Sequence, residues 1–255
     1  MSKSATKEGT TRYARKFAGR AAEGHFRETQ RLVLSSLGIG TYLGQPDAKT
    51  DEGYAAAAVA AVENGINVMD AAINYRFQRS ERSVGAAIRQ LAAKGFDREE
   101  IVVCTKGGYL TPDGAMPGDP NEYFFREYIQ PGIFSAKDIA AGSHCMTPRF
   151  LKNQLGRSLR NLGIECVDVY YLHNPETQLS EITKDEFLNR IREAFTFLEA
   201  AVDAGEIQFY GMATWNGFRQ DARARDAMQL GEIAQVAQEI AGGRRRWIAG
   251  AAAQQ

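Results

Sequence analysis

The sequence has few of the features that mark secreted or membrane-spanning proteins. Its 255 residues include only three cysteines, Cys104, Cys145 and Cys166, and no pair of them has the spacing of a CxxC motif or a metal site. So small and odd a set indicates reduced thiols in a cytoplasmic protein rather than a disulfide framework. No apolar run approaches the roughly 18 residues that a membrane-spanning helix needs.

The sequence also has no excess of charge of either sign. It contains 31 basic and 31 acidic residues, so its formal net charge is zero and gives no indication of nucleic acid or a membrane surface as a partner. Residues 1–31 are polar and basic and lack the apolar centre of a secretory signal. We therefore expect a flexible or surface-lying N-terminal extension at 1–31 and a main domain at 32–255.

From about residue 32 onward, strand-like and helix-like segments alternate. The strand-like segments are rich in apolar and β-branched residues, whereas two of the helix-like segments end at a glycine placed as a stop, Gly65 and Gly95. The predicted strands occupy 31–44, 66–72, 99–108, 164–176 and 206–215, with a sixth beginning at 244, and the predicted helices occupy 51–65, 80–95, 147–163, 183–205 and 222–243.

This alternation with short joins is typical of a parallel sheet whose strands are connected by helices. A doubly wound sheet and a (β/α)8 barrel both fit the pattern. No G-x-G-x-x-G motif opens the first predicted helix, which disfavours a dinucleotide-binding Rossmann domain. Residues 109–146 interrupt the alternation, and their aromatic content predicts a folded flap rather than a disordered loop.

Polar residues stand where the predicted strands end. Asp70 and Tyr75 follow the second strand, Lys106 ends the third and His173 ends the fourth. Asp70 could instead cap the next helix, Tyr75 could be a packing residue and His173 a core histidine. Lys106 is harder to explain structurally, because a lysine at the end of a buried strand is costly unless it is paired. Because the carboxyl ends of neighbouring parallel strands lie about 5 Å apart, we expect the four side chains to converge on one pocket.

Such a pocket suits the protonation of an oxygen on which negative charge builds. A free tyrosine has a pKa of about 10, and a lysine cation beside it favours the phenolate. Carbonyl reduction needs such a proton donor. None of these side chains supplies a hydride, so a nicotinamide cofactor is implied. His25, His144 and His173 lack H-x-H or HExxH spacing, so we expect no metal site.

Five blocks of the sequence, in order between about residues 32 and 240, resemble the aldo-keto reductases. This resemblance implies a (β/α)8 barrel enzyme that reduces aldehydes or ketones with NADPH, or with NADH. It also implies a catalytic set in which Tyr75 is the general acid, Lys106 and Asp70 tune it, and His173 orients the carbonyl. The blocks read LGIGTYLG, NVMDAAINYRFQRSERSVGAAI, EEIVVCTKGG, SLRNLGIECVDVYYLHNPE and AAVDAGEIQFYGMATWN.

The resemblance further implies residues that border the cofactor. Gly40, Thr41 and Tyr42 would line the nicotinamide together with Asp70, and Thr214 would stand in for the polar pair that holds the carboxamide in the family. The insertion at 109–146 is longer than the family's third loop and follows Lys106 directly. It stands where a barrel loop would cover the active site.

The family's last two strands have no counterpart in the sequence, so we expect an incomplete barrel of about five to six βα units. The expected function is NADPH-dependent reduction of a small-molecule carbonyl substrate in the cytoplasm, without nucleic acid or membrane partners. The alternative is a truncated, non-catalytic relative that keeps the four residues and acts as an inert or binding subunit. The sequence does not identify the substrate or the oligomeric state.

Overall fold

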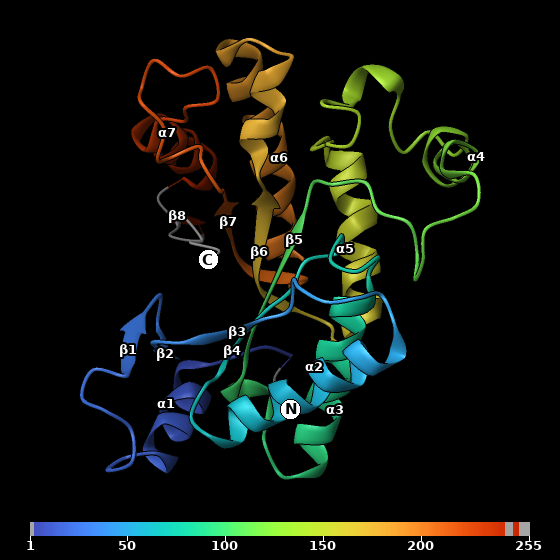
Figure 1. Cartoon of the computed structure of the whole chain (residues 1–255). Coiled ribbons are helices and arrows are strands. Elements are labelled where there is room, and N and C mark those ends of the chain that lie inside the picture. Colours follow the sequence, from blue (N-terminus) through green and yellow to red (C-terminus); the bar gives the residue numbers. More distant parts are fainter. Residues whose placement is uncertain (1–2, 243–246, 250–255) are drawn as a thin grey trace. The chain divides into compact units, whose positions relative to one another are not determined.

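The computed structural model describes residues 3–242 and the backbone of residues 247–249 (Figure 1). The described chain forms two compact units. Unit 1 comprises residues 3–105, 113–115 and 158–169, and unit 2 comprises residues 106–112, 116–157, 170–242 and 247–249.

The main sheet has six strands, arranged in the chain order that the alternation of strands and helices predicts. The strands follow one another in the sheet as they do in the chain, which is the arrangement that repeated strand–helix units produce. The pairs β3–β4, β4–β5 and β7–β8 are parallel, and β3 and β8 are the two ends of the described sheet, which is therefore not closed. The six strands are β3 (Gly38–Gly40), β4 (Val68–Asp70), β5 (Val102–Gly107), β6 (Val167–His173), β7 (Ile207–Ala213) and β8 (Trp247–Ala249).

The predicted helices at 51–65, 80–95, 147–163 and 183–205 are confirmed. Gly65 and Gly95 follow their helices with φ of 97° and 86°, the left-handed conformation that ends a helix. Thr183 caps the longest helix by accepting the Glu186 N–H at 3.2 Å. The helices are α1 (Lys7–Lys16), α2 (Ala48–Glu63), α3 (Arg79–Ala93), α4 (Pro120–Phe124), α5 (Pro148–Leu162), α6 (Lys184–Asp203) and α7 (Leu230–Ala241), with single turns η1 (Arg98–Glu100), η2 (Phe125–Ile129), η3 (Ala136–Asp138) and η4 (Pro175–Ser180).

Two predicted elements differ in extent. The helix expected from residue 222 begins only at Leu230, and turns with one bend occupy residues 222–226. The strand expected at 31–44 is two strands, because β2 (Leu32–Ser35) pairs antiparallel with β1 (Phe26–Thr29) and only β3 joins the parallel sheet. Residues 244–246 of the expected sixth strand lie outside the described residues, whereas β8 lies within them.

Of the flexible or surface-lying extension expected at 1–31, the flexible alternative does not hold where the chain forms α1 and β1. Residues 7–16 form α1, and the side chain of Tyr13 on this helix is fully buried. The Tyr13 hydroxyl donates a hydrogen bond to the Val62 carbonyl at 2.6 Å. A buried tyrosine with a satisfied hydroxyl anchors a helix whose other residues are mostly polar.

The carboxylate of Asp168 on β6 joins three segments of unit 1. Asp168 is fully buried, and its Oδ2 accepts hydrogen bonds from the Val103 N–H of β5 and from Arg98, both at 2.7 Å. Its Oδ1 accepts the Ala5 N–H at 2.7 Å. A buried charge is tolerated only when it is paired and hydrogen-bonded, and this carboxylate meets both conditions.

The segment 109–146 is folded, as its aromatic residues predict. Tyr128, Phe134, Cys145 and Phe150 form a buried cluster, in which the Tyr128 and Phe134 rings stack with centroids 5.5 Å apart. Phe125 remains 54% exposed, so the aromatic residues of the segment do not all contribute to this cluster. Because Phe150 belongs to α5, this burial packs the segment against that helix.

Gly53 and Gly85 lie in α2 and α3, two neighbouring helices of unit 1 (Figure 1). Substitutions at these glycines test how closely α3 packs against the end of α5. A Cβ on Gly85 of α3 would lie 2.6 Å from the Leu162 carbonyl oxygen, whereas a Cβ on the exposed Gly53 of α2 would meet no atom within 4 Å. We expect Gly85→Ala to lower the free energy of unfolding by about 1–3 kcal/mol through overpacking. Gly53→Ala should raise it by about 0.5–1 kcal/mol through helix propensity. Urea denaturation measures both, and stabilisation by both substitutions would contradict the packing described.

Candidate active site

The predicted site residues of unit 1 lie at the ends of β3 and β4. Gly40 and Asp70 are register partners in the parallel pair, and Asp70 is in turn the partner of Cys104 on β5. Asp70 is half-buried and is not the cap of α3, because Gln78 holds that position. The structural explanation of Asp70 as a helix cap is therefore excluded.

Thr41 joins the ends of these two strands. Its buried hydroxyl donates a hydrogen bond to the Asp70 carbonyl at 2.9 Å, and its oxygen lies 2.5 Å from the Ser80 hydroxyl at the start of α3. The hydroxyl has one hydrogen, so Ser80 donates the second bond. Thr41 thus holds the strand ends, and its hydroxyl is already used within unit 1.

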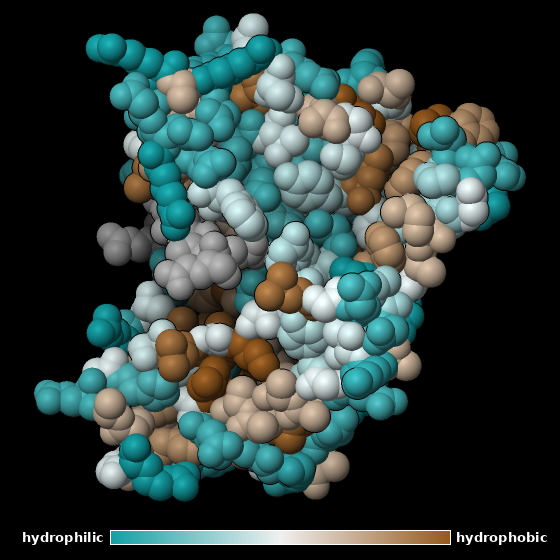
Figure 2. Space-filling model, in the orientation of Figure 1, coloured by the Kyte–Doolittle hydropathy of each residue, from teal (hydrophilic) through white to brown (hydrophobic). Residues whose placement is uncertain are grey.

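Tyr75 lies under a second aromatic ring. The Tyr75 side chain is only 2% exposed, and the ring of Tyr42 lies 4.9 Å from its ring, centroid to centroid. Tyr42 itself is 52% exposed, and Leu37 and Leu43 in the same segment are 62% and 70% exposed. Hydrophobic residues are visible at the surface of unit 1 in Figure 2. Tyr42 is an exposed aromatic surface beside a buried phenol.

The backbone after Tyr75 is held in an uncommon conformation. Arg76, Phe77 and Gln78 have φ values of 48°, 57° and 71°, so three successive non-glycine residues occupy the left-handed region before α3 begins. Each such residue costs on the order of 1–3 kcal/mol and persists only where its surroundings fix it. This turn therefore sets the direction in which the chain leaves Tyr75.

Contacts from other segments of unit 1 fix the turn. Arg76, whose side chain is 2% exposed, pairs with Asp51, and its guanidinium lies 4.6 Å from the centre of the Tyr54 ring. Asp51 also pairs with Arg79 at 2.7 Å. The Phe77 carbonyl accepts the N–H of residue 114 at 2.8 Å, and the Gln78 amide oxygen accepts a bond from residue 161 at 3.1 Å.

The predicted site residues of unit 2 lie at the ends of β5, β6 and β7. Lys106 is fully buried and His173 is 4% exposed. The pKa of His173 lies well below its usual value because burial disfavours the imidazolium, and both the charge of Lys106 and the neighbouring His144 lower this pKa further. His173 is therefore a neutral imidazole at pH 7.

The two glycines after Lys106 make room for neighbouring side chains. A Cβ on Gly107 would collide with the Tyr170 hydroxyl, and a Cβ on Gly108, whose φ is 143°, would lie 2.8 Å from His144 Nε2. The Gly108 N–H donates to Gln154 Oε1 at 2.7 Å. Glycine is required at the end of β5 because neighbouring side chains approach the backbone closely there, and not only because the chain needs flexibility.

Sequence reasoning missed His144 as a site residue. It is fully buried in the segment between β5 and α5, and its Nε2 lies 2.8 Å from the carbonyl oxygen of His173. Burial lowers the pKa of His144 to about 4. Lacking metal-ligand spacing, this histidine has one signal in the sequence, its place in the irregular segment that follows Lys106.

Thr214 is buried, and its hydroxyl is engaged within unit 2. The hydroxyl donates to Glu176 Oε1 at 2.5 Å and accepts the Gly217 N–H at 2.8 Å. The same Glu176 oxygen accepts the Trp215 N–H at 3.1 Å. The second oxygen, Glu176 Oε2, is buried without a hydrogen-bond partner among the described residues. A buried carboxylate oxygen of this kind is an acceptor available for a ligand's N–H.

The structure thus brings the predicted residues together in two sets. In unit 1, direct contacts join Thr41 to Asp70 and Tyr42 to Tyr75, and Gly40 is in register with Asp70. In unit 2, Lys106, His173 and Thr214 end strands that are consecutive in the sheet. Among the described residues, no group of three His, Cys, Asp or Glu side chains could hold a metal ion, and no helix has the length and apolar character to cross a membrane.

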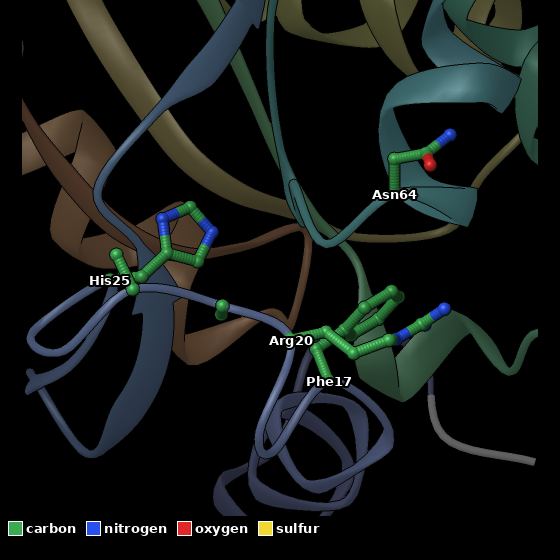
Figure 3. Close-up of a pocket in the computed structure, with 6 residues that line it drawn as sticks. Phe17, Arg20, His25 and Asn64 are labelled. Atoms are coloured by element: carbon green, nitrogen blue, oxygen red, sulfur yellow. The ribbon is translucent and has the colours of Figure 1, made fainter.

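A pocket elsewhere in unit 1 contains none of these residues. It has a volume of about 390 Å³ and lies among Phe17, Arg20, His25 and Asn64 (Figure 3). The Arg20 guanidinium lies 5.0 Å from the centre of the Phe17 ring, and His25 Nε2 lies 3.0 Å from the Gly65 carbonyl oxygen. The His25 contact links the N-terminal segment to the end of α2, whereas the Arg20 contact lies within the N-terminal segment.

Comparison with known proteins identifies related sequences. The model of the Aldo/keto reductase family matches residues 36–239. The chain is 41% identical over 138 residues to 2,5-diketo-D-gluconic acid reductase B of Corynebacterium sp., a match that covers 54% of this chain and 34% of that protein. It is 25% identical over 210 residues to the NADH-specific methylglyoxal reductase of Escherichia coli, covering 80% and 55%.

Solved structures show the same fold. A glycerol dehydrogenase from Gluconobacter oxydans superposes with a TM-score of 0.54 at 19% identity, covering 86% of this chain and 53% of that one. An aldo/keto reductase from Klebsiella pneumoniae in complex with NADP and acetate gives a TM-score of 0.52 at 19% identity, covering 85% and 55%. The described sheet is thus part of the (β/α)8 barrel architecture. The chain spans about half the length of these structures.

The ion pair between Arg76 and Asp51 can be tested as a support of the left-handed turn at residues 76–78. Asp51→Ala leaves the buried Arg76 without its carboxylate partner, and we expect the free energy of unfolding to fall by about 2–4 kcal/mol. Glu52→Ala, at the exposed neighbouring position, should change it by less than about 0.5 kcal/mol. Chemical denaturation measures both, and equal effects of the two substitutions would show that the pair does not hold the turn.

The neutral state of buried His144 makes stability depend on pH. Its pKa falls from 6.5 to about 4 on folding, so the unfolded chain binds this proton first as the pH is lowered. The contribution of this group to the free energy of unfolding, about 3 kcal/mol, is fully present above pH 6.5 and is lost as the pH falls toward 4. We expect His144→Gln to lose correspondingly less stability over that window in urea denaturation at a series of pH values. Parallel pH profiles of the two proteins would contradict this assignment.

Proposed function

Because the chain belongs to the aldo/keto reductase family, we propose that it reduces an aldehyde or a ketone to the alcohol with NADPH or NADH. One observation carries the proposal. The four residues Asp70, Tyr75, Lys106 and His173 end or follow the consecutive strands β4, β5 and β6, and the family match covers all of them. The carboxyl ends of barrel strands are where catalytic residues gather in this architecture.

The polar groups near the strand ends fit a nicotinamide. Glu176 Oε2, a buried acceptor without a partner among the described residues, suits the N–H groups of a carboxamide. Tyr42 presents an exposed aromatic ring that suits stacking. We propose that Glu176 accepts the carboxamide N–H in place of Thr214, whose hydroxyl it engages. Thr41, whose hydroxyl is likewise engaged, and Tyr42 keep the roles beside the nicotinamide that the family resemblance implies. When bound, the nicotinamide supplies a hydride to the carbonyl carbon.

In this proposal Tyr75 supplies the proton. Its phenolic hydrogen passes to the carbonyl oxygen as that oxygen gains negative charge, which leaves a phenolate on Tyr75. The cation of Lys106 stabilises this phenolate, and the carboxylate of Asp70 keeps the lysine charged. The phenol is then restored by a proton from solvent, so that the net reaction consumes one carbonyl, one reduced nicotinamide and one proton.

The neutral imidazole of His173 orients the carbonyl. A neutral ring has one N–H, which donates to the same carbonyl oxygen and does not compete with Tyr75 as a second acid. The low pKa of His173 supports this role, since burial and Lys106 keep the ring uncharged at pH 7. Donors held in a dry site stabilise the developing charge more strongly than donors in water do.

Removal of the Tyr75 hydroxyl tests the proposal. We expect Tyr75→Phe to lower kcat for carbonyl reduction by at least about a hundredfold, because only the proton donor is lost. The affinity for NADPH, measured by fluorescence titration, should stay within about twofold. Methylglyoxal and 2,5-diketo-D-gluconate, the compounds in the names of two relatives, are suitable first substrates.

Tyr54→Phe is the matched control. It removes a hydroxyl of unit 1 that, among the contacts described, donates only to the Leu43 carbonyl. It keeps the aromatic ring that lies against the Arg76 guanidinium. Its kcat should equal that of the wild type. Turnover by Tyr75→Phe near the wild-type rate would refute the assignment. A chain that binds neither NADPH nor NADH at millimolar concentration would support the alternative, a non-catalytic relative.

A further inference from the structure

His144 lies outside the proposed catalytic set and contacts the backbone of one of its members. It is fully buried, and its Nε2 lies 2.8 Å from the carbonyl oxygen of His173, the last residue of β6. Isolated antiparallel bridges to Tyr109 and Ala140 hold its own backbone. The histidine therefore reaches the end of β6 from the segment that separates β5 from α5.

The contacts of Gln178 assign the tautomer of His144. Arg190 donates to Gln178 Oε1 at 2.6 Å, which fixes the orientation of the amide. Gln178 Nε2 then donates to the His144 carbonyl at 3.0 Å and faces His144 Nδ1 at 2.8 Å. An amide nitrogen only donates, so Nδ1 carries a lone pair and the hydrogen of the neutral ring is on Nε2. Nε2 consequently donates to the carbonyl of His173.

We propose that His144 is a positioning residue for His173, an inference that rests on the proposed function of that histidine as the group that orients the carbonyl. The hydrogen bond fixes the peptide at the end of β6, where the next residue, Asn174, turns into the left-handed region with φ of 46°. Fixing this peptide fixes the Cα–Cβ direction of His173 and so the position of its imidazole.

Two further contacts support this role. The Tyr109 ring lies 5.0 Å from the His144 ring and 5.2 Å from the His173 ring, perpendicular to both within a few degrees. Gly108 leaves the path of the hydrogen bond open, because a Cβ there would lie 2.8 Å from Nε2 and 3.2 Å from the His173 carbonyl oxygen. The segment 109–146 thus supports the backbone of His173 through His144. This role does not require the segment to act as a lid.

Histidine NMR tests the hydrogen bond without any assay of activity. The chain contains only three histidines, so ¹⁵N-histidine labelling gives few signals, and His25→Asn and His144→Phe assign them. At pH 7 we expect His144 with a protonated Nε2 and an unprotonated Nδ1. We expect Gln178→Glu to protonate Nδ1, since a carboxylate there accepts a hydrogen. A wild-type His144 with protonated Nδ1 would overturn the proposal.

The signals of His173 test the positioning itself. We expect them to shift or broaden in His144→Phe, which keeps an aromatic ring and loses the donor, and to shift less in His144→Gln, whose amide can donate in its place. Should His144→Phe fail to fold, His144→Leu, which also lacks the donor, provides the same readout. His173 signals that stay at their wild-type positions in these variants would overturn the inference, whether or not the protein reduces a carbonyl.

Kinetics give a second readout that a merely structural role would not produce. We expect His144→Phe to lower kcat at least about tenfold with the NADPH dissociation constant within about twofold, and His144→Gln to recover most of the rate. Unchanged kcat in His144→Phe would contradict the positioning role. If the wild-type chain reduces no carbonyl, the proposed function fails, whereas the NMR result still decides the inference about His144.

Discussion

The carboxylate of Asp168 is the interaction on which the arrangement of the strands most depends. It joins β6 to the Val103 N–H of β5, pairs with Arg98 and accepts a backbone N–H from the N-terminal segment. Each of its partners lies on a different segment, so loss of the charge would leave several buried donors unsatisfied at once. The strands that it aligns are the two that continue to Lys106 and His173, so the chemistry at their ends depends on a polar contact within their buried part.

Local signals made much of the fold predictable. Glycines after α2 and α3, a threonine before α6 and a proline at the start of α5 each act within a few residues, and the structure has those boundaries close to where they were expected. The alternation of strand and helix then implied parallel strands in chain order. The placement of Asp70, Lys106 and His173 at strand ends followed from the same pattern, because each polar residue closes an apolar run.

Other features depend on contacts between distant residues and leave little trace in the sequence. The docking of α1 buries Tyr13 among mostly polar neighbours, together with the small residues Gly9 and Thr10. The three left-handed residues after Tyr75 are arginine, phenylalanine and glutamine, which seldom adopt that conformation without tertiary support. Thr41 was expected to border a nicotinamide and Thr214 to hold its carboxamide, yet the hydroxyl of each is engaged by protein groups. Only the packed structure reveals these partners.

Gly108 and His144 are separated in the chain but share one small volume. A methyl group at the first position and an imidazole at the second exclude each other, so substitutions at the two positions are not independent. A lineage that lost the histidine would be released from the need for space at position 108, although the left-handed backbone there would still favour glycine. Related sequences that possess the histidine should therefore also possess the glycine, whereas the reverse dependence is weaker. This directional coupling would distinguish sequences that support the end of β6 in this way from those that do not.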